Sequence, residues 1–190
     1  MASLVAGLMT ASCSVFGVRT TPEPSYTVER QIGAVEIRRY GERIGADTVV
    51  QGDEMQARNL GFRRLAGYIF GANSPKTNIE MTAPVVQTRT EAGGWRIRFF
   101  MPTEYSLQNL PAPNDRAVDL VTVPPERVAV LRYSGLTTAA AVQEEQTRLL
   151  RTLEDAGIAS EGLPFSWFYD PPWTIPPLRR NEAVVRLGPP

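Results

Sequence analysis

Histidine is the most informative absence, because this chain of 190 residues contains none, and cysteine occurs once, at position 13. A chain without histidine has no Ser-His-Asp triad, no histidine-ligated metal and no histidine-ligated haem. A single cysteine allows no disulfide within the chain and no thiolate cluster. Catalysis would therefore depend on carboxylates, tyrosines, the single lysine Lys76 or a cofactor.

An excess of either charge is also missing, since 20 Lys and Arg residues balance 20 Asp and Glu residues. Proteins that bind nucleic acid normally carry a basic patch, so the composition predicts no nucleic-acid partner. With 43% hydrophobic residues, the length fits one globular domain with a short appendage.

Paired carboxylates for acid–base chemistry are not evident either. Glu80, Asp170 and Glu182 are the carboxylates nearest the motifs described below, and their spacing does not predict a catalytic pair. We interpret each as a surface or turn residue and predict that the protein is not an enzyme, although an enzyme built on these carboxylates is an alternative.

The N-terminal segment, residues 1–25, is similar to a bacterial lipoprotein signal followed by a tether. Small and apolar residues fill positions 2–12 and lead directly to Cys13, which would be lipidated. Two departures are Thr10, where leucine is usual, and the lack of a basic residue before the apolar run. The run is too short to span a bilayer, which takes about 20 residues. We predict a periplasmic lipoprotein of the cell envelope; the alternative is a frayed terminus with a free thiol on a cytoplasmic protein.

The first half of the domain has the pattern of strands followed by a helix. Strands are expected over residues 26–31, 35–40 and 43–51. A helix over 54–70 follows, which Asp53 can cap. Its apolar residues at helical spacing predict the buried face, and they are Met55, Phe62, Leu65, Ala66 and Ile69. Gly61 and Gly67 interrupt this helix at a cost of about 1 kcal/mol each. We interpret them as points of close packing on the sheet, with contact to a flat ligand as the alternative.

The segment 78–85 reads Asn-Ile-Glu-Met-Thr-Ala-Pro-Val, and its apolar residues recur at every second position. This period predicts a half-buried strand. Pro84 has no N–H to donate, so the strand should lie at an edge or a bulge. Segments 85–90 and 95–101 then predict a hairpin in which Arg96 and Arg98 face solvent. The irregular stretch 102–113 could form a lid.

The second half repeats this order loosely. Strands are expected over 118–123 and 127–134, then a helix over 138–156 that Gly157 ends. The buried residues of this helix should be Val142, Leu149, Leu150 and Leu153. The sequence at 128–133 echoes that at 35–40. Strands and a helix occurring twice predict two similar halves around a pseudo-two-fold axis.

The C-terminal stretch combines aromatic residues with prolines. Residues 165–173 read Phe-Ser-Trp-Phe-Tyr-Asp-Pro-Pro-Trp, and the prolines should stiffen a loop from which Tyr169 and Trp173 project. Arg179 and Arg180 follow, before a last strand over 183–187. The alternative is that the aromatic loop closes one end of the sheet and the arginines are solvated.

Together these motifs resemble the SOUL haem-binding protein family. The resemblance covers residues 26–187 and is carried by Val-Glu-Ile-Arg-Arg-Tyr at 35–40, Met-Thr-Ala-Pro-Val at 81–85, Tyr-Asp-Pro-Pro-Trp at 169–173 and Arg-Arg-Asn-Glu at 179–182. It implies an α+β domain over 26–190: a distorted antiparallel β-sheet or barrel made of two similar strand-helix-strand halves, with one helix packed on each half.

The resemblance also implies a function, which is non-catalytic binding of haem or another tetrapyrrole in a shallow apolar groove. By position, the groove would be lined by Asn59, Phe62, Arg63 and Ala66 on the first helix and by Trp173. Arg63, Arg179 or Arg180 could meet the propionates. Without histidine, the macrocycle would be held by its faces or through a weaker Met or Tyr ligand, or haem would not bind.

Such a groove would support micromolar binding at best, which suits a carrier or buffer. The domain is expected to be a monomer that meets the membrane only through a lipid anchor. The main alternative is an interaction module whose groove binds a hydrophobic peptide or another amphipathic small molecule.

Overall fold

The structure is a computed structural model that describes residues 21–171 and 173–189. Those residues form a nine-stranded antiparallel sheet, a small two-stranded sheet and two α-helices. The strands of the large sheet are β1 (Tyr26–Ile32), β2 (Val35–Tyr40), β3 (Arg43–Val50), β5 (Val85–Arg89), β6 (Trp95–Phe100), β8 (Asp119–Val123), β9 (Glu126–Tyr133), β10 (Glu161–Phe168) and β11 (Asn181–Leu187). The remaining elements are α1 (Glu54–Ile69), α2 (Ala139–Asp155), the 3₁₀ helix η1 (Pro176–Leu178) and the short strands β4 (Asn73–Ser74) and β7 (Ala112–Pro113). The expected α+β class is confirmed.

The order of strands in the large sheet reveals two similar halves. It runs β1-β2-β9-β11-β10-β5-β6-β3-β8, with β1 and β8 at the open edges. Leaving out β1, the order read from one edge matches the order read from the other edge when each element of the first half is exchanged for its counterpart in the second. The first half is β2, β3, α1, β5 and β6, and their counterparts are β8, β9, α2, β10 and β11. Strands β5 and β10 pair at the centre. The predicted pseudo-two-fold arrangement is therefore present, and β1 is an addition at one edge.

The sequence echo between β2 and β9 reflects a shared environment and not the symmetry. The symmetry relates β9 to β3, whereas β2 and β9 are antiparallel neighbours with Val35 opposite Leu131 and Ile37 opposite Ala129. These four residues are buried in one core beneath α2. Neighbouring strands that cover the same helix need the same alternation of apolar residues, so the echo identified the wrong pair.

Both α-helices begin at capping residues. The carboxylate of Asp53 accepts a hydrogen bond from the Gln56 N–H at 2.9 Å, and the hydroxyl of Thr138 accepts one from the Ala141 N–H at 3.3 Å. Gly157 follows α2 with a φ of 67°, as the predicted stop requires. In the described part of the chain, neither helix is long and apolar enough to cross a membrane.

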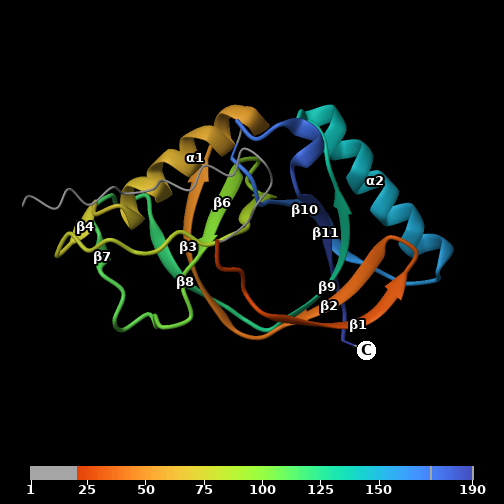
Figure 1. The fold of residues 1–190 in the computed structure, drawn as a ribbon, viewed down its shortest axis with the longest axis horizontal. Coiled ribbons are helices and arrows are strands. Elements are labelled where there is room, and N and C mark those ends of the chain that lie inside the picture. The colour runs from red at the N-terminus through yellow and green to blue at the C-terminus, as the bar shows by residue number, and fades with distance from the viewer. Residues whose placement is uncertain (1–20, 172, 190) are drawn as a thin grey trace, which may run out of the picture.

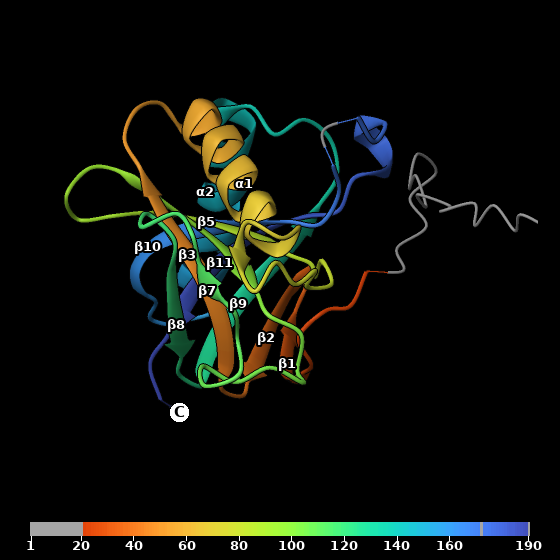
Figure 2. The ribbon, with the colours of Figure 1, turned by 90° about the vertical axis from the view of Figure 1, so that its left-hand side faces the viewer.

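The two α-helices cover the same face of the sheet, each over its own half (Figures 1 and 2). Helix α1 packs on β3 and β6, and α2 packs on β9 and β11. At Gly61 an added Cβ would lie 2.4 Å from Cγ1 of Ile97, so this glycine permits the close approach of α1 to the sheet. At Gly67 the nearest atom would be 4.0 Å away, and close packing does not explain that glycine.

The other face of the sheet curls on itself and forms a core of its own (Figure 1). Its aromatic members are Tyr40, Phe100, Phe165, Trp167 and Tyr169. The expected solvent-facing side of the hairpin is therefore wrong in part. Phe100 is 2% exposed on that side, and the Arg98 guanidinium donates to both oxygens of Asp47 at 2.6 and 2.7 Å. Strong curvature gives this sheet two buried faces, which alternation along one strand cannot predict.

The strand predicted over residues 78–85 is wrong. Asn78 forms an isolated bridge with Phe70, and regular pairing begins only at Val85. The Ala83 N–H donates to the Pro22 carbonyl at 2.9 Å, and the Thr82 hydroxyl donates to the Phe100 carbonyl at 2.7 Å. Pro84 has no N–H to contribute. Because these groups bond outside a ladder, the segment is an irregular connection with several buried side chains.

Candidate functional site

One side of α1 faces away from the sheet and exposes large apolar side chains. Met55 is 48% exposed, Phe62 38% and Phe70, at the C-cap, 65%. Asn59 and the half-buried Ala66 lie between them at intervals of three or four residues, so the five side chains share one side of the helix. We call Met55, Asn59, Phe62, Ala66 and Phe70 the α1 strip.

This strip corrects the face that the sequence pattern assigned to the core. Met55 and Phe62 were expected to be buried, and they are exposed. Ala57 and Tyr68 are buried instead, with 0% and 1% exposure. The buried face centres on Gly61, where α1 touches β6. Helix α1 carries apolar residues on two sides, and their spacing in the sequence does not show which of the two sides packs on the sheet.

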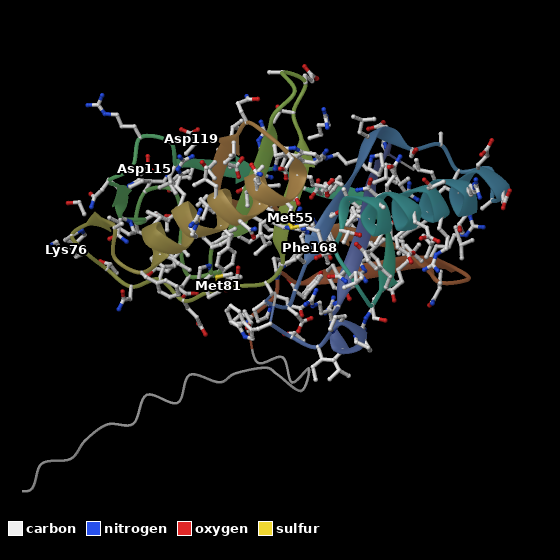
Figure 3. The ribbon with its side chains drawn as sticks, turned by 90° about the horizontal axis from the view of Figure 1, so that it is seen from above. Met55, Lys76, Met81, Asp115, Asp119 and Phe168 are labelled. Carbon is white, nitrogen blue, oxygen red and sulfur yellow. The ribbon has the colours of Figure 1, made fainter. Side chains whose placement is uncertain are left out.

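The segment between β4 and β5 runs beside the strip. Figure 3 shows Met81 of this segment next to α1. Met81 is half-buried and packs with Ala66 against the core under α1. On the strip itself, the Phe62 ring meets the buried Phe99 edge-on, with centroids 5.3 Å apart. Phe62 is thus fixed in position from below while part of its ring stays accessible.

The loop between β10 and η1 lies near the N-terminal half of α1. The Arg58 guanidinium stacks 4.3 Å above the ring of Phe168, the last residue of β10, and Figure 3 shows Met55 beside Phe168. Arg58 also donates to the Thr137 carbonyl at 2.8 Å, and the Gly135 N–H of the same β9–α2 loop donates to the Pro176 carbonyl at 2.9 Å. These bonds connect α1 to the loop that carries Trp173.

The predicted loop residues divide into an exposed and a buried one. Trp173 is 66% exposed, as expected for a projecting side chain. Tyr169 is 9% exposed, so its predicted projection is wrong. Phe165, Trp167 and Phe168 belong to β10 and not to a loop. The aromatic run thus spans the end of a strand and the beginning of the loop.

Three of the sequence motifs converge on the carboxylate of Glu182, which is 0% exposed. It accepts hydrogen bonds from Arg38 Nη1 and Nη2 at 3.0 and 3.2 Å, from the Tyr169 hydroxyl at 2.8 Å and from Arg180 Nε at 3.1 Å. We call these four residues the Glu182 cluster. A buried carboxylate needs such partners, because an unpaired buried charge is strongly destabilising. The interpretation of Glu182 as a surface residue is therefore wrong.

Burial also changes the acidity of the tyrosine in this cluster. Removal from water, together with the nearby Glu182 charge, raises the pKa of Tyr169 well above its usual range. Tyr169 therefore remains a neutral donor to Glu182 at physiological pH. The cluster fixes the start of the C-terminal loop relative to β2 and β11.

The three predicted arginines occupy different environments. Arg63 is exposed on α1 beside the strip. Arg179 is half-buried, and its Nε donates to the Thr174 carbonyl at 2.8 Å. Arg180 belongs to the Glu182 cluster, stacks 3.7 Å above the Tyr169 ring and donates to both oxygens of Glu23 at 2.8 and 3.0 Å. The structure thus brings Asn59, Phe62, Arg63 and Ala66 together, with Arg180 turned into the polar cluster.

Sequence reasoning missed Arg58 as a residue beside the strip. It comes three residues after Met55 and four before Phe62, which is the spacing of one helix side and could have identified it. Burial lowers the pKa of its guanidinium below the usual arginine range without making it neutral at physiological pH. The site therefore offers an apolar surface flanked by cations. Among the described residues, no group of three or more Cys, Asp and Glu side chains could hold a metal ion.

The family comparison and the sequence relatives of this chain point to the same protein family. Residues 21–186 match the family described as SOUL heme-binding protein. The chain is 28% identical over 166 residues to heme-binding protein 2 of Mus musculus, which covers 83% of this chain and 79% of that protein. It is 30% identical over 162 residues to heme-binding protein 2 of Homo sapiens, with 81% and 78% covered.

Solved structures extend the likeness to the fold. The C-terminal domain of EcmrR superposes with a TM-score of 0.64 at 10% identity, covering 86% of this chain and 98% of that domain. A hydrolase from Listeria innocua superposes with a TM-score of 0.57 at 8% identity, covering 84% and 94%. At these identities the likeness concerns the fold alone.

Proposed function

Because this chain belongs to the SOUL heme-binding protein family, we propose that it binds haem or another tetrapyrrole on the α1 strip. The family relationship is the observation that carries the ligand class. The strip supports the location, since contiguous exposed apolar side chains mark binding surfaces more often than isolated ones do. The proposed role is a carrier or buffer and not a catalyst.

The residues of the strip fit a flat ring that is held by its face. Ala66 is small enough to leave room for the ring between Phe62 and Phe70, and Asn59 adds a polar contact. Trp173 would border the ring from the C-terminal loop. Arg63 and Arg179 are the arginines proposed to meet the ligand's carboxylates, while Arg180 would position the loop through the Glu182 cluster.

Iron ligation by imidazole is ruled out by the composition, since the chain has no histidine. Met55 on the strip and Met81 beside it are thioethers that could serve as weak ligands. When bound, a haem would supply an iron and a large apolar plane. The protein's own contribution would be apolar contact, the amide of Asn59 and the positive charge of Arg63.

The free energies of apolar burial and of association together favour a moderate affinity for the ligand. Burying about 400 Å² of apolar ligand surface at about 25 cal/mol per Å² contributes roughly 10 kcal/mol, against an association cost of about 4 to 15 kcal/mol. Exposed arginine–carboxylate pairs add about 0 to 1 kcal/mol each. With the lowest association cost and two such pairs, the balance reaches at best about −8 kcal/mol, which is about micromolar binding. Such affinity allows release to a partner, as a carrier requires.

A spectral titration tests the ligand and its location together. Haemin should give a red-shifted Soret band that saturates near one equivalent. Phe62→Asp places a charge in the strip and should weaken binding at least about tenfold, since burying an unpaired charge is costly. Leu60→Asp is the matched control: Leu60 is 41% exposed on the same helix but about 200° around the axis from Phe62.

Each outcome has a distinct meaning. Equal weakening by both variants would place the ligand elsewhere on the chain. No spectral change with haemin or with metal-free protoporphyrin would contradict tetrapyrrole binding, and a thermal shift with an amphipathic peptide alone would favour an interaction module. Equal affinity for haemin and protoporphyrin would show that iron ligation contributes nothing.

We further propose that the protein works as a monomer tethered in the cell envelope through Cys13. Cys13 lies outside the described residues, so this proposal depends on the sequence pattern alone. Mass spectrometry of protein purified from membranes should find diacylglycerol on Cys13 as the first residue. A Cys13→Ser variant should leave the membrane fraction. An intact, unmodified N-terminus would contradict the tether and would leave the binding proposal standing.

A further inference from the structure

The inner face of the curled sheet holds a buried cation with unused donors. The Arg43 side chain is 8% exposed, and its guanidinium lies 4.4 Å from the ring centre of Tyr40 and 4.6 Å from that of Phe100. Its Nη2 donates to the Glu126 carboxylate. Its Nε and Nη1 are buried and have no hydrogen-bond partner within residues 21–171 and 173–189. Buried donors are almost always hydrogen-bonded. Two unpaired N–H donors on one buried guanidinium therefore indicate a place where an acceptor could bind.

A second unpaired donor belongs to a neighbouring aromatic residue. Trp167 is 1% exposed and packs edge-on against Tyr40 with centroids 5.3 Å apart, and its buried indole Nε1 has no hydrogen-bond partner among the residues that the structure describes. Arg43 and Trp167 line one small pocket together with Tyr40, Phe100 and Tyr169. The pocket is therefore aromatic, with buried donors from a cation and an indole, while the Glu23 carboxylate in its wall is already paired with Arg180.

Residues 22–24 close this pocket, and we call them the strap. Glu23 and Pro24 form part of the pocket wall, and the space behind them is too small for a water molecule. The strap is held by two main contacts: the Ala83 N–H donates to the Pro22 carbonyl at 2.9 Å, and Arg180 donates to the Glu23 carboxylate. It precedes β1, so no sheet pairing holds it.

Pro22 and Pro24 have no N–H to add further bonds. By contrast, Tyr40, Arg43, Phe100 and Trp167 in the pocket wall belong to paired strands. The strap is therefore the part of this region that a ligand could displace.

We propose that the strap covers a second binding site, which takes a small aromatic monocarboxylate. The ligand's carboxylate would accept hydrogen bonds from Arg43 and from Trp167, and its ring would take the place of Pro24 against Tyr40. Glu23 would then leave Arg180, which keeps Glu182 as its partner. A carboxylate satisfies two or three donors at once, and charge-assisted bonds of this kind are the strong ones.

This site is independent of the α1 strip, because it lies on the opposite face of the sheet. The pocket residues belong to the inner core, whereas the side chains beneath α1 form a separate core. The inference thus goes beyond the proposed tetrapyrrole binding. The two sites can be occupied or abolished separately.

The test is an NMR titration of the full-length chain with cinnamate. The Trp167 indole N–H and the Arg43 Nε–H signals, assigned with Trp167→Phe and Arg43→Lys, should both shift and saturate. Glu23→Gln removes the ion pair of the strap and should tighten cinnamate binding about fivefold. Glu29→Gln is the matched control, because Glu29 also pairs with arginines, Arg39 and Arg127, through a side chain of similar exposure, 23% against 27%.

The outcomes separate this inference from the proposed function. Phe62→Asp should leave cinnamate binding unchanged. Absence of a Trp167 shift in both the wild-type chain and Glu23→Gln would overturn the site, as would equal tightening by Glu23→Gln and Glu29→Gln. Binding of cinnamyl alcohol as tight as that of cinnamate would overturn the role of the donors. If haemin shifts the Trp167 signal and Phe62→Asp does not affect haemin, the strip fails while the inner pocket stands.

Discussion

The two α-helices occupy equivalent positions in the two halves, yet their outward sides differ. Helix α2 turns polar and charged residues to solvent, among them Glu144, Arg148 and Arg151. Helix α1 turns the strip to solvent, with Phe62 and Phe70 on it. Because the fold places both helices on the same face of one sheet, the fold alone does not require an apolar outward side. The strip is therefore a feature of one half, as a binding surface would be.

The inward sides of the helices are alike. Leu65 on α1 and Leu149 on α2 are both 0% exposed, and each lies at the centre of the core between its helix and the sheet. The two halves therefore share a structural role and differ in what they offer to a partner. Four pairs of matched variants can break or sharpen this comparison.

The largest effect is expected at the shared structural positions. Leu65→Ala and Leu149→Ala should each lower the free energy of unfolding by about 3 kcal/mol, within the range of about 2 to 5 kcal/mol for buried leucines. Urea denaturation of both variants measures this directly. A cost for Leu65→Ala well below that for Leu149→Ala would mean that α1 is not an equal structural partner, and the comparison would fail.

A smaller effect separates the two glycines within α1. Gly61→Ala should lower the free energy of unfolding by about 1 to 3 kcal/mol, because the new methyl group would collide with Ile97. Gly67→Ala should raise it by up to about 1 kcal/mol, because alanine favours the helix and the nearest atom is 4.0 Å away. Thermal unfolding of both variants shows whether each substitution stabilises or destabilises the chain. Destabilisation by Gly67→Ala would indicate a constraint on that position other than packing.

Much of the fold was predictable from local patterns. Polar caps, glycine stops and alternation fixed α1, α2 and most of the strands to within a residue or two, as at Asp53 and Gly157. The order of the elements also predicted the two halves. Local patterns failed where long-range pairing decides the outcome: segment 78–85 bonds to Pro22 and Phe100, which lie far away in the sequence.

The candidate site was predictable in part. The family resemblance named Asn59, Phe62, Arg63 and Ala66 as groove residues, and the structure places them on or beside one side of α1, where their role in binding stays a prediction. Which side of α1 faces the sheet depends on the contact between Gly61 and Ile97, and the interpretation of Gly61 as a point of close packing is confirmed. The apolar spacing nevertheless assigned Met55 and Phe62 to the buried side, and they are exposed. Likewise, the burial of Glu182 depends on Arg38, which lies more than a hundred residues earlier in the chain.

Buried tyrosines offer a finer comparison of the two halves. The Tyr68 hydroxyl donates to the Pro111 carbonyl at 2.9 Å, whereas the buried Tyr133 hydroxyl has no hydrogen-bond partner in the described part of the chain. Tyr68→Phe should therefore lower the free energy of unfolding by about 1 kcal/mol at neutral pH, and Tyr133→Phe should leave it nearly unchanged or raise it. Equal losses from both variants would show that Tyr133 has a partner in solution, such as an ordered water.

Tyr68 also predicts that the free energy of unfolding depends on pH in the alkaline range. Burial raises the pKa of Tyr68 from 10.0 to about 12, so the folded chain holds this proton more tightly than the unfolded chain does. Its contribution to stability is therefore complete below about pH 10 and is lost as the pH rises through about 12. In Tyr68→Phe the decline of the unfolding free energy across this window should be shallower. An unchanged decline would assign the alkaline loss to other tyrosines.

The smallest effect on stability is expected on the outward sides, where the comparison began. Phe70 is 65% exposed, so Phe70→Ser should change the free energy of unfolding by no more than about 0.5 kcal/mol. The exposed Asp155→Ser at the end of α2 should behave alike. Their effects on haemin should nevertheless differ. A ring that buries about 50 Å² against the ligand contributes about 1.2 kcal/mol, so Phe70→Ser should weaken binding severalfold.

Asp155→Ser should leave haemin binding unchanged in the same titration. A fold that tolerates both substitutions, while only one of them weakens the ligand, would show that the apolar side chains of α1 serve binding and not folding. A loss of about 2 kcal/mol or more in the free energy of unfolding is typical of truncating a buried side chain. If Phe70→Ser caused such a loss, the strip would serve folding and not binding. The difference between the helices would then reflect how each half is stabilised.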